Sequence, residues 1–171
     1  MKKVLKYTGA VILILVVVFF SAGLIFPTVT YETKVTINKP VEATFGAFTN
    51  SLKIIEWVPG LVGIGWVSGT QNEAGSKWLF IIKIRGEKYE MNQILNAIKK
   101  NELFSITTTC EMFSSDVDVK FVNKGSSTEL VATSKLTGTN WFWRSVFFFA
   151  QPMLTGQDED MYNKFKEVAE K

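Results

Sequence analysis

Residues 28–48 read TVTYETKVTINKPVEATFGAF, and this stretch changes from one periodicity to another near its proline. Before the proline, the odd-numbered positions from 29 to 37 carry V, Y, T, V and I, whereas the even-numbered positions are polar. This alternation predicts a half-buried β-strand. Asn38 and Pro40 then suit a helix cap and a first helical turn, and Glu42 complements the positive end of a helix dipole. The apolar face of this expected helix consists of Val41, Phe45 and Phe48.

Downstream of this helix, the pattern predicts a second short helical piece over SLKIIEW (51–57) and then a series of strands. One of these strands is expected to run through ELFSITTTCEMF (102–113), with Phe104, Cys110 and Met112 on one face. Turn signals rich in Gly, Lys, Asn and Ser separate the strands at 73–76, 85–87, 99–101 and 123–126. Short strands at this spacing are typical of an antiparallel meander.

The C-terminal residues 161–171, MYNKFKEVAEK, predict a final helix with Met161, Phe165 and Val168 on one face. The acidic run 158–160 is expected in its first turn. The order is therefore a strand, two short helices, a run of strands and a terminal helix. This order predicts an α+β fold with the helices against one face of a curved antiparallel sheet.

The N-terminal residues predict a membrane anchor over 1–27 and a folded domain over 28–171. Lys2, Lys3 and Lys6 precede an uncharged apolar run of about twenty residues, which is enough to cross a bilayer as a helix. A cleaved signal peptide is the alternative, since residues 21–23 (Ser-Ala-Gly) suit a cleavage site, but the apolar run resumes after them. We favour the anchor. The position of the lysines predicts a single span in the cytoplasmic membrane, with the N-terminus inside and the domain outside.

The composition excludes several classes of function. Three of the 19 basic residues lie before the span, and the remaining 16 balance the 16 acidic residues, so the domain lacks the basic surface of a nucleic-acid binder. The chain has no histidine, which excludes Ser-His-Asp and Cys-His catalysis and zinc sites that use histidine. Cys110 is the sole cysteine, so no internal disulfide can form. No phosphate-binding loop or metal-ligand spacing is recognisable, and the sequence predicts neither a cofactor nor a metal.

The order of elements resembles that of the START-like, polyketide-cyclase/dehydrase superfamily (SRPBCC), over roughly residues 29–171. The resemblance rests on VTINKPVEATFGAF (35–48), on Trp57, on the turn at Gly75 and on MLTGQDEDMYNKFKEV (153–168). An apolar span directly before the first strand is similar to a membrane-anchored bacterial branch of this superfamily. The resemblance implies a helix-grip fold, in which a bent sheet wraps a long C-terminal helix. It also implies a cavity for hydrophobic ligands between the sheet and that helix.

The stretch WFWRSVFFFA (141–150) carries six aromatic residues in ten positions. Its apolar run of about 14 residues spans only about 21 Å as a helix, which is too short to cross a bilayer. It predicts a core helix capped by Asn140, and the fold implied by the resemblance places its inner stripes along the cavity. Trp141 and Phe148 fall on the same side as Arg144, so we expect them in the lipid headgroup zone. A protein interface is the other reading of this outer side.

We therefore predict a membrane-tethered domain that binds a hydrophobic small molecule or a lipid. The alternatives are a cyclase- or dehydrase-like enzyme and a protein-interaction domain with a filled core. The candidate catalytic groups are Glu90, Glu111, Tyr89 and Arg85. Strand alternation predicts both carboxylates on the solvent side, so no catalytic residue is assigned. The predicted cavity wall consists of Trp57, Trp78, Phe80, Ile82, Tyr89, Met91, Phe104, Ile106, Val119, Phe121, Trp143 and Phe147.

Overall fold

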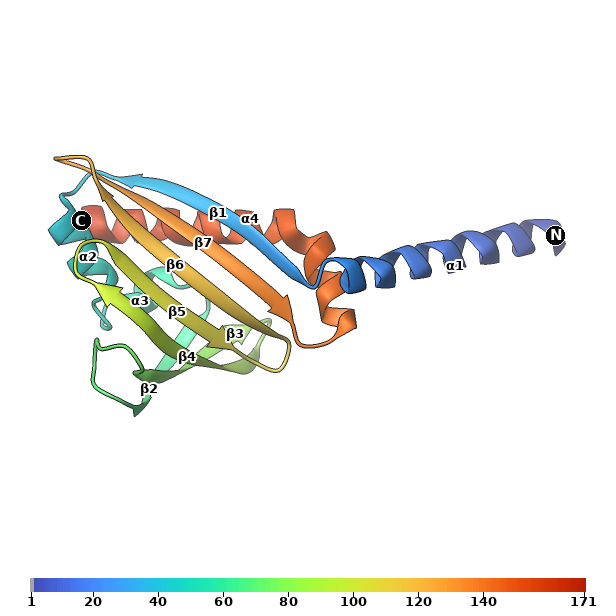
Figure 1. Ribbon diagram of the computed structural model, residues 1–171, viewed down its shortest axis with the longest axis horizontal. Coiled ribbons are helices and arrows are strands. Elements are labelled where there is room, and N and C mark those ends of the chain that lie inside the picture. The colour runs from blue at the N-terminus through green and yellow to red at the C-terminus, as the bar shows by residue number, and fades with distance from the viewer. Residues whose placement is uncertain (1) are drawn as a thin grey trace.

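A seven-stranded antiparallel sheet forms the body of the protein, and its strands follow the order β1-β7-β6-β5-β4-β3-β2 (Figure 1). The computed structural model describes residues 2–171. The elements are α1 (Lys2–Ile25), β1 (Thr28–Ile37), α2 (Val41–Phe48), α3 (Ile54–Trp57), β2 (Leu61–Ser68), β3 (Lys77–Ile84), β4 (Glu87–Lys99), β5 (Leu103–Thr109), β6 (Phe113–Asn123), β7 (Thr128–Gly138) and α4 (Trp141–Glu170). The sheet bends around α4, and α1 projects away from it (Figure 1). The predicted α+β arrangement is confirmed.

The first strand and the helix after it follow the sequence pattern closely. β1 pairs with β7 along its whole length. The predicted apolar face of α2 is buried, and it consists of Val41, Phe45 and Phe48. The predicted cap is wrong, because Pro40 occupies the N-cap position. The backbone N–H of Asn38 instead donates a hydrogen bond of 2.7 Å to Oε1 of Glu170, which ties the end of β1 to the end of α4.

The strands from β2 to β7 form the predicted meander, but one turn lies earlier than expected. β5 ends at Thr109, and β6 already begins at Phe113. Cys110 and Met112 therefore lie in a turn and do not continue the strand that carries Phe104. The backbone N–H of Cys110 donates to the carbonyl oxygen of Phe113 at 3.0 Å. This turn contains neither Gly nor Pro, the residues that most often mark a turn, so the sequence does not reveal it.

A single helix of 30 residues, α4, takes the place of two separate C-terminal helical segments. Asn140 caps it as predicted, since its side-chain Oδ1 accepts a hydrogen bond of 3.1 Å from the backbone N–H of Trp143. Pro152 lies inside the helix, where it removes one backbone donor and favours a kink. The axis of α4 changes direction near its N-terminal third (Figure 1). The acidic run 158–160 thus lies in the middle of α4 rather than at a helix start.

Helix α1 has the properties of a membrane-spanning segment by length and composition. Its residues Lys6–Ile25 form a 20-residue helical stretch with a mean hydropathy of 2.7. The side chains from Lys6 to Val18 are exposed, and those of the last turns contact α4. Only two residues, Phe26 and Pro27, separate the end of α1 from the start of β1, so the sheet lies close to the end of this helix.

Candidate functional site

The inner face of the sheet has two parts, because α4 covers only one side of it. α4 packs along β1 and β7, and it also contacts α2 and α3. Among the described elements, β3, β4 and β5 make no comparable contact with α4. The inner face of these three strands is therefore covered only where α2 and α3 lie over it, at the end far from α1 (Figure 1).

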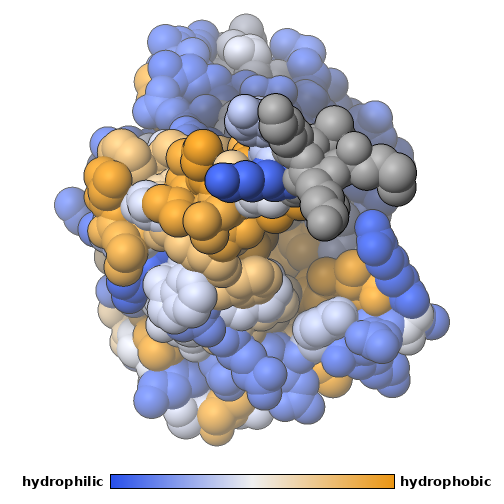
Figure 2. Space-filling model, turned by 90° about the vertical axis from the view of Figure 1, so that its right-hand side faces the viewer, coloured by the Kyte–Doolittle hydropathy of each residue, from blue (hydrophilic) through white to orange (hydrophobic). Residues whose placement is uncertain are grey.

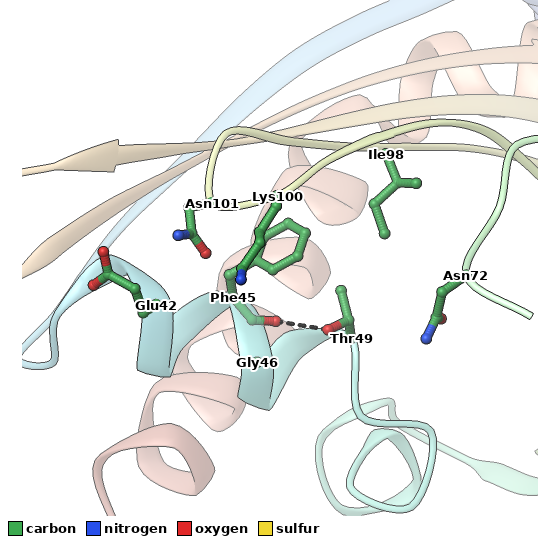
Figure 3. A pocket seen from close by; sticks show the side chains of 8 residues that line it. All are labelled: Glu42, Phe45, Gly46, Thr49, Asn72, Ile98, Lys100 and Asn101. Carbon is green, nitrogen blue, oxygen red and sulfur yellow. Dashed lines mark hydrogen bonds between the residues drawn. The ribbon is translucent and has the colours of Figure 1, made fainter.

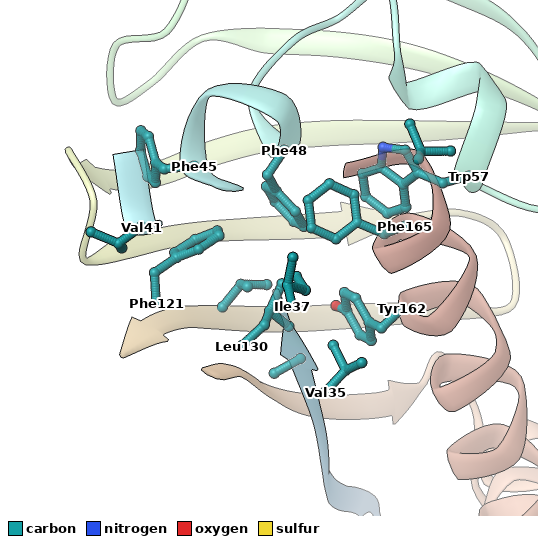
Figure 4. Packing of buried hydrophobic residues seen from close by; sticks show 13 residues of the cluster. Val35, Ile37, Val41, Phe45, Phe48, Trp57, Phe121, Leu130, Tyr162 and Phe165 are labelled. Carbon is teal, nitrogen blue, oxygen red and sulfur yellow. The ribbon is translucent and has the colours of Figure 1, made fainter. Parts of the chain in front are cut away.

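The end far from α1 is a packed aromatic core (Figure 4). Phe165 of α4 is fully buried, and its ring centroid lies 5.1 Å from that of Phe48 and 5.2 Å from that of Trp57. Phe48 also meets the rings of Phe104 and Phe121 edge-on, at centroid distances of 5.4 and 5.3 Å. Part of the predicted cavity wall thus belongs to this core, namely Trp57, Phe104, Val119 and Phe121.

A second, smaller cluster joins β2 and β3. Phe80 and Ile82 of β3 are buried beside Leu61 of β2, and Trp78 and Met91 pack against them. Further predicted wall residues, Phe80 and Ile82, thus have buried protein neighbours. Their side chains can support a ligand surface, but little of their own surface is available to a ligand.

Between these clusters and α4 lies an open apolar surface, which we call the trough. Its strand residues share the inner face of the sheet, since Ile106 pairs with Val117 and the inward-facing Met91 pairs with Phe80. α4 completes it near α1, where the ring of Phe147 meets that of Phe113 edge-on at 5.8 Å. The trough is lined by half-buried side chains, namely Trp78, Met91, Ile106, Phe113, Val117, Trp143 and Phe147. All of these except Phe113 and Val117 were predicted as wall residues.

The trough side chains are half-buried, so part of each remains accessible to solvent. Two hollows stand out among residues 2–171, and neither lies within the trough. One of about 470 Å³ lies between α2 and the β4–β5 turn, where Glu42, Phe45 and Asn101 contribute to its lining (Figure 3). The other, of about 240 Å³, lies across β2, β3 and β4 and borders the trough at Trp78. The internal cavity expected from the sequence therefore stays a prediction, and half-buried apolar side chains lie where it was expected.

A small polar cluster lies next to the trough, where α4 packs on β1 and β7. The hydroxyl of Ser134 in β7 donates a hydrogen bond of 2.9 Å to Oδ2 of Asp158 in α4. Tyr31 of β1 and Tyr162 of α4 are close enough for the charge of Asp158 to act on both phenols. Ser134 pairs with the trough residue Val117 in the sheet, so the cluster forms a polar border of the trough.

Burial governs the protonation of this cluster. It raises the pKa of the Asp158 carboxyl above its usual range, and the hydrogen bond from Ser134 acts in the opposite direction. Burial and then the charge of Asp158 raise the pKa of Tyr31 to about 12 and raise the pKa of Tyr162 as well. Thr33, also on the inner face of β1, has a buried hydroxyl without a hydrogen-bond partner among the described residues. The cluster is therefore polar and partly buried, and a buried hydroxyl group beside it lacks a hydrogen-bond partner among the described residues.

Sequence reasoning missed Asp158, although a signal was available. Asp158, Tyr162 and Phe165 are spaced i, i+4 and i+7, so they share one face of a continuous helix. A carboxylate within a buried helical stripe is unusual, because charged side chains are rarely buried without a partner. Pro152 suggests that the helix ends there. Asp158 is then expected in the first turn of a separate helix, where an acidic residue is common.

The residues considered as catalytic groups in the sequence are not among those that line the trough. Glu90 is exposed on β4, as the alternation predicted. Glu111 is exposed too, but it lies in the β5–β6 turn and not in the strand on which its prediction rested. Arg85 is exposed in the β3–β4 turn. Tyr89, a predicted wall residue, is half-buried, and its hydroxyl donates a hydrogen bond of 3.0 Å to Oε2 of Glu87.

Trp141 and Phe148, the two predicted membrane-contact residues, lie against α1. The ring centroid of Trp141 is 4.2 Å from that of Phe20, and Phe148 stacks on Phe26 at 4.8 Å. Trp141 still exposes 51% of its surface. Sequence reasoning did not anticipate that the outer side of this segment has a protein partner within the same chain.

No protein-family model matches the sequence, and no curated protein matches it either. Solved structures are similar over most of the chain. Ara h 8.0201 shares 12% identity at a TM-score of 0.66, with 83% of this chain and 97% of that one covered. The Zhui aromatase/cyclase from Streptomyces sp. R1128 shares 10% identity at a TM-score of 0.62, with coverages of 82% and 96%.

A third similar structure is a point mutant of norcoclaurine synthase from Thalictrum flavum, solved in complex with a transition-state analogue. It shares 10% identity at a TM-score of 0.62, and the likeness covers 83% of this chain and 94% of that one. In all three cases, nearly the whole of the solved chain matches at very low identity, so the likeness concerns the fold. The bent antiparallel sheet and long C-terminal helix described above are thus a START-like helix-grip fold.

Proposed function

We propose that this protein is a membrane-tethered domain that binds an apolar small molecule or a lipid in the trough. The observation that carries the proposal is the set of half-buried apolar side chains of the trough, which includes Ile106 and Val117 on the sheet and Phe147 at the start of α4. Each Å² of apolar surface removed from water contributes about 25 cal/mol, so a ligand that covers these side chains gains affinity from their burial. Ligand sites are usually apolar surfaces with a few polar groups that fix orientation.

The polar cluster supplies such an orienting group. Asp158 already accepts a hydrogen bond from Ser134 and retains further acceptor capacity on its carboxylate. A ligand with a long apolar body and one hydroxyl or amine group fits this arrangement, because the donor group can bond to Asp158 while the body covers the trough. The similar structures support a small-molecule role, since one is an aromatase/cyclase and another was solved with a transition-state analogue.

Tethering by α1 completes the proposal. Ala22 and Gly23, which lie at the possible signal-cleavage site, are buried in the structure, which favours an uncleaved anchor. Lys2, Lys3 and Lys6 favour a cytoplasmic N-terminus, which puts the domain on the outer side of the cytoplasmic membrane. This arrangement agrees with the sequence likeness to a membrane-anchored bacterial branch of the superfamily.

A second candidate function is an enzyme of the cyclase or dehydrase type, and Asp158 is the observation that favours it. A partly buried carboxyl with a raised pKa beside an apolar surface is suited to general acid or base catalysis. The two candidates differ in what Asp158→Asn does to a bound molecule. An enzyme with this change would accumulate an unconverted molecule that the unchanged protein does not retain, whereas a binding protein would carry the same molecule in both forms.

The binding proposal is tested by filling the trough. We expect Val117→Trp to prevent photolabelling of the trough by a diazirine-bearing palmitic acid, with the full chain in phosphatidylcholine nanodiscs. Val122→Trp is the matched control, because Val122 lies on the same strand but is 38% exposed on the outer face. Labelled peptides from β5, β6 and the start of α4 in the control, and their loss in Val117→Trp, would support the proposal. Labels confined to α1 in both variants would refute it.

A further inference from the structure

Helix α1 and the start of α4 form a close interface around one glycine. A Cβ atom on Gly23 would clash with Trp141 and would come within 2.7 Å of the backbone nitrogen of Ser145. Ser145 is fully buried, and its hydroxyl donates a hydrogen bond of 3.0 Å to the carbonyl oxygen of Trp141. Only glycine allows the two helices to approach this closely. The contact therefore fixes the position of α4 relative to the last turns of α1.

Aromatic rings extend this interface on both sides of Gly23. Phe19 stacks on Phe149 with ring centroids 5.6 Å apart and meets Phe142 at 6.3 Å. Phe20 meets Trp141, and Phe26 stacks on Phe148. The α4 residues in these contacts recur at positions 141, 142, 145, 148 and 149, which together form one helical stripe. A stripe of this kind indicates a defined interface rather than an incidental contact.

An exposed apolar band remains beside this interface. Phe142, Phe149 and Met153 of α4 expose 44%, 52% and 59% of their surfaces. Leu24 and Ile25 at the end of α1 expose 71% and 67%. Viewed from the side on which α1 projects, apolar residues gather in the middle of this end of the molecule, and part of the apolar surface is recessed (Figure 2). If α1 spans a membrane, exposed apolar side chains beside its end are expected to contact the lipid.

The position of Phe19 along α1 sets the depth of this band. The stretch Lys6–Ile25 measures about 30 Å as a helix, which equals the apolar thickness of a typical bilayer. Phe19 lies six residues before Ile25, so it lies about 9 Å inside the apolar layer when this stretch spans it. Phe142 and Phe149 contact Phe19 directly, so they cannot remain above the membrane surface while α1 crosses it.

We propose that the first three turns of α4, from Trp141 to Gln151, lie at the membrane surface with Phe142 and Phe149 inserted into the lipid. This inference rests on the part of the proposed function that makes α1 a membrane span. Phe side chains are favoured inside the apolar layer, and Trp side chains such as Trp141 are favoured where the apolar and polar layers of the bilayer meet. Trp143 and Phe147 on another side of the same turns line the trough, so the first three turns of α4 separate the trough from the lipid.

The test measures the depth of α4 in the full chain, reconstituted in phosphatidylcholine vesicles. In a Cys110→Ser background, one cysteine replaces Phe149 and is labelled with an NBD fluorophore. A second protein carries the label at Glu159, which is exposed on α4 beyond Pro152. We expect lipids with a nitroxide on the acyl chain to quench the label at position 149 and to leave the label at position 159 bright.

Gly23→Leu provides the matched perturbation, because it separates α4 from α1 without removing the span. It should abolish quenching at position 149. Gly9→Leu is the control, since a Cβ atom on Gly9 meets no other atom within 4 Å. An unquenched label at position 149 in a protein whose α1 is protected from protease would overturn the inference and leave the tether intact. Failure of α1 to insert would overturn both, and photolabelling of the trough reports on ligand binding separately.

Discussion

Ser134→Ala tests whether the polar border of the trough holds a carboxylate. The Ser134 hydroxyl donates a 2.9 Å hydrogen bond to Asp158, and none of the ion pairs formed by the described residues includes Asp158. A hydrogen bond to a charged group contributes about 1.5–3 kcal/mol, whereas one between neutral groups contributes about 0.5–1.5 kcal/mol. We therefore expect Ser134→Ala to lower the free energy of unfolding at pH 7 by about 2 kcal/mol.

The same change in an Asp158→Asn background should cost only about 1 kcal/mol, because the asparagine oxygen accepts the bond without a charge. The difference of about 1 kcal/mol between the two backgrounds is the coupling energy of a double-mutant cycle. Urea unfolding of the full chain in mild detergent, followed by tryptophan fluorescence, measures all four proteins. Equal costs in the two backgrounds at pH 7 would refute the reasoning, since they would mean that the bond does not stabilise a carboxylate.

The pH dependence of this cycle has a defined sign. Burial raises the pKa of folded Asp158 above its ordinary value of 3.8, so the folded state binds the proton more readily than the unfolded state. The contribution of Asp158 to stability is therefore complete below pH 3.8 and is lost as the pH rises through the raised folded-state pKa. The coupling energy between Ser134 and Asp158 is a separate quantity. It should decrease as the pH falls through the pKa of Asp158, because the hydrogen bond then no longer has a charged acceptor.

Two further changes test the core and the tyrosines. Phe165→Ala should lower the free energy of unfolding by about 3–5 kcal/mol, because it empties a fully buried ring site between Phe48 and Trp57, whereas exposed Asn163→Ala should change it by less than about 0.5 kcal/mol. A small loss for Phe165→Ala in urea unfolding would contradict the packed core. Tyr31 has a folded pKa of about 12, above the ordinary value of 10.0, so its contribution is present below pH 10 and is lost between pH 10 and 12. Tyr31→Phe should thus flatten the alkaline loss of stability, and an unchanged pH profile would contradict the burial of this phenol.

The sequence predicts the framework of the fold because local patterns decide it. Alternation in β1 and the stripe of Val41, Phe45 and Phe48 survive unchanged in the structure. Two boundaries fail for identifiable reasons. The turn after Thr109 has no Gly or Pro to mark it, and Pro152 is tolerated inside α4 although prolines usually end a helix.

The site is less predictable than the fold. Strand alternation predicts on which face of the sheet a side chain lies, but it does not predict whether a helix covers that side chain. Trp57 and Phe121 face inward as predicted, yet α2, α3 and Phe165 fill the space in front of them. Met91 and Ile106 also face inward, and they remain half-buried because α4 does not cover their part of the sheet. The paths of α2, α3 and α4 across the sheet separate these two groups.

The contact between α1 and α4 depends on residues that are far apart in sequence. Phe19, Phe20, Gly23 and Phe26 recur at helical spacing, which marks one face of α1, but nothing local identifies the partner of that face. A transmembrane reading treats this face as lipid-exposed. The structure shows that Ser145 and the aromatic residues around it cover part of this face, so the last turns of α1 pack against the folded domain.

The measurement that tests the central claim most directly is native mass spectrometry of the full chain released from phosphatidylcholine nanodiscs. The account predicts a protein peak that carries one lipid-sized adduct, the loss of this adduct in Val117→Trp and its retention in Val122→Trp. A bare protein mass for the unchanged chain, or an adduct that Val117→Trp does not displace, would contradict the account.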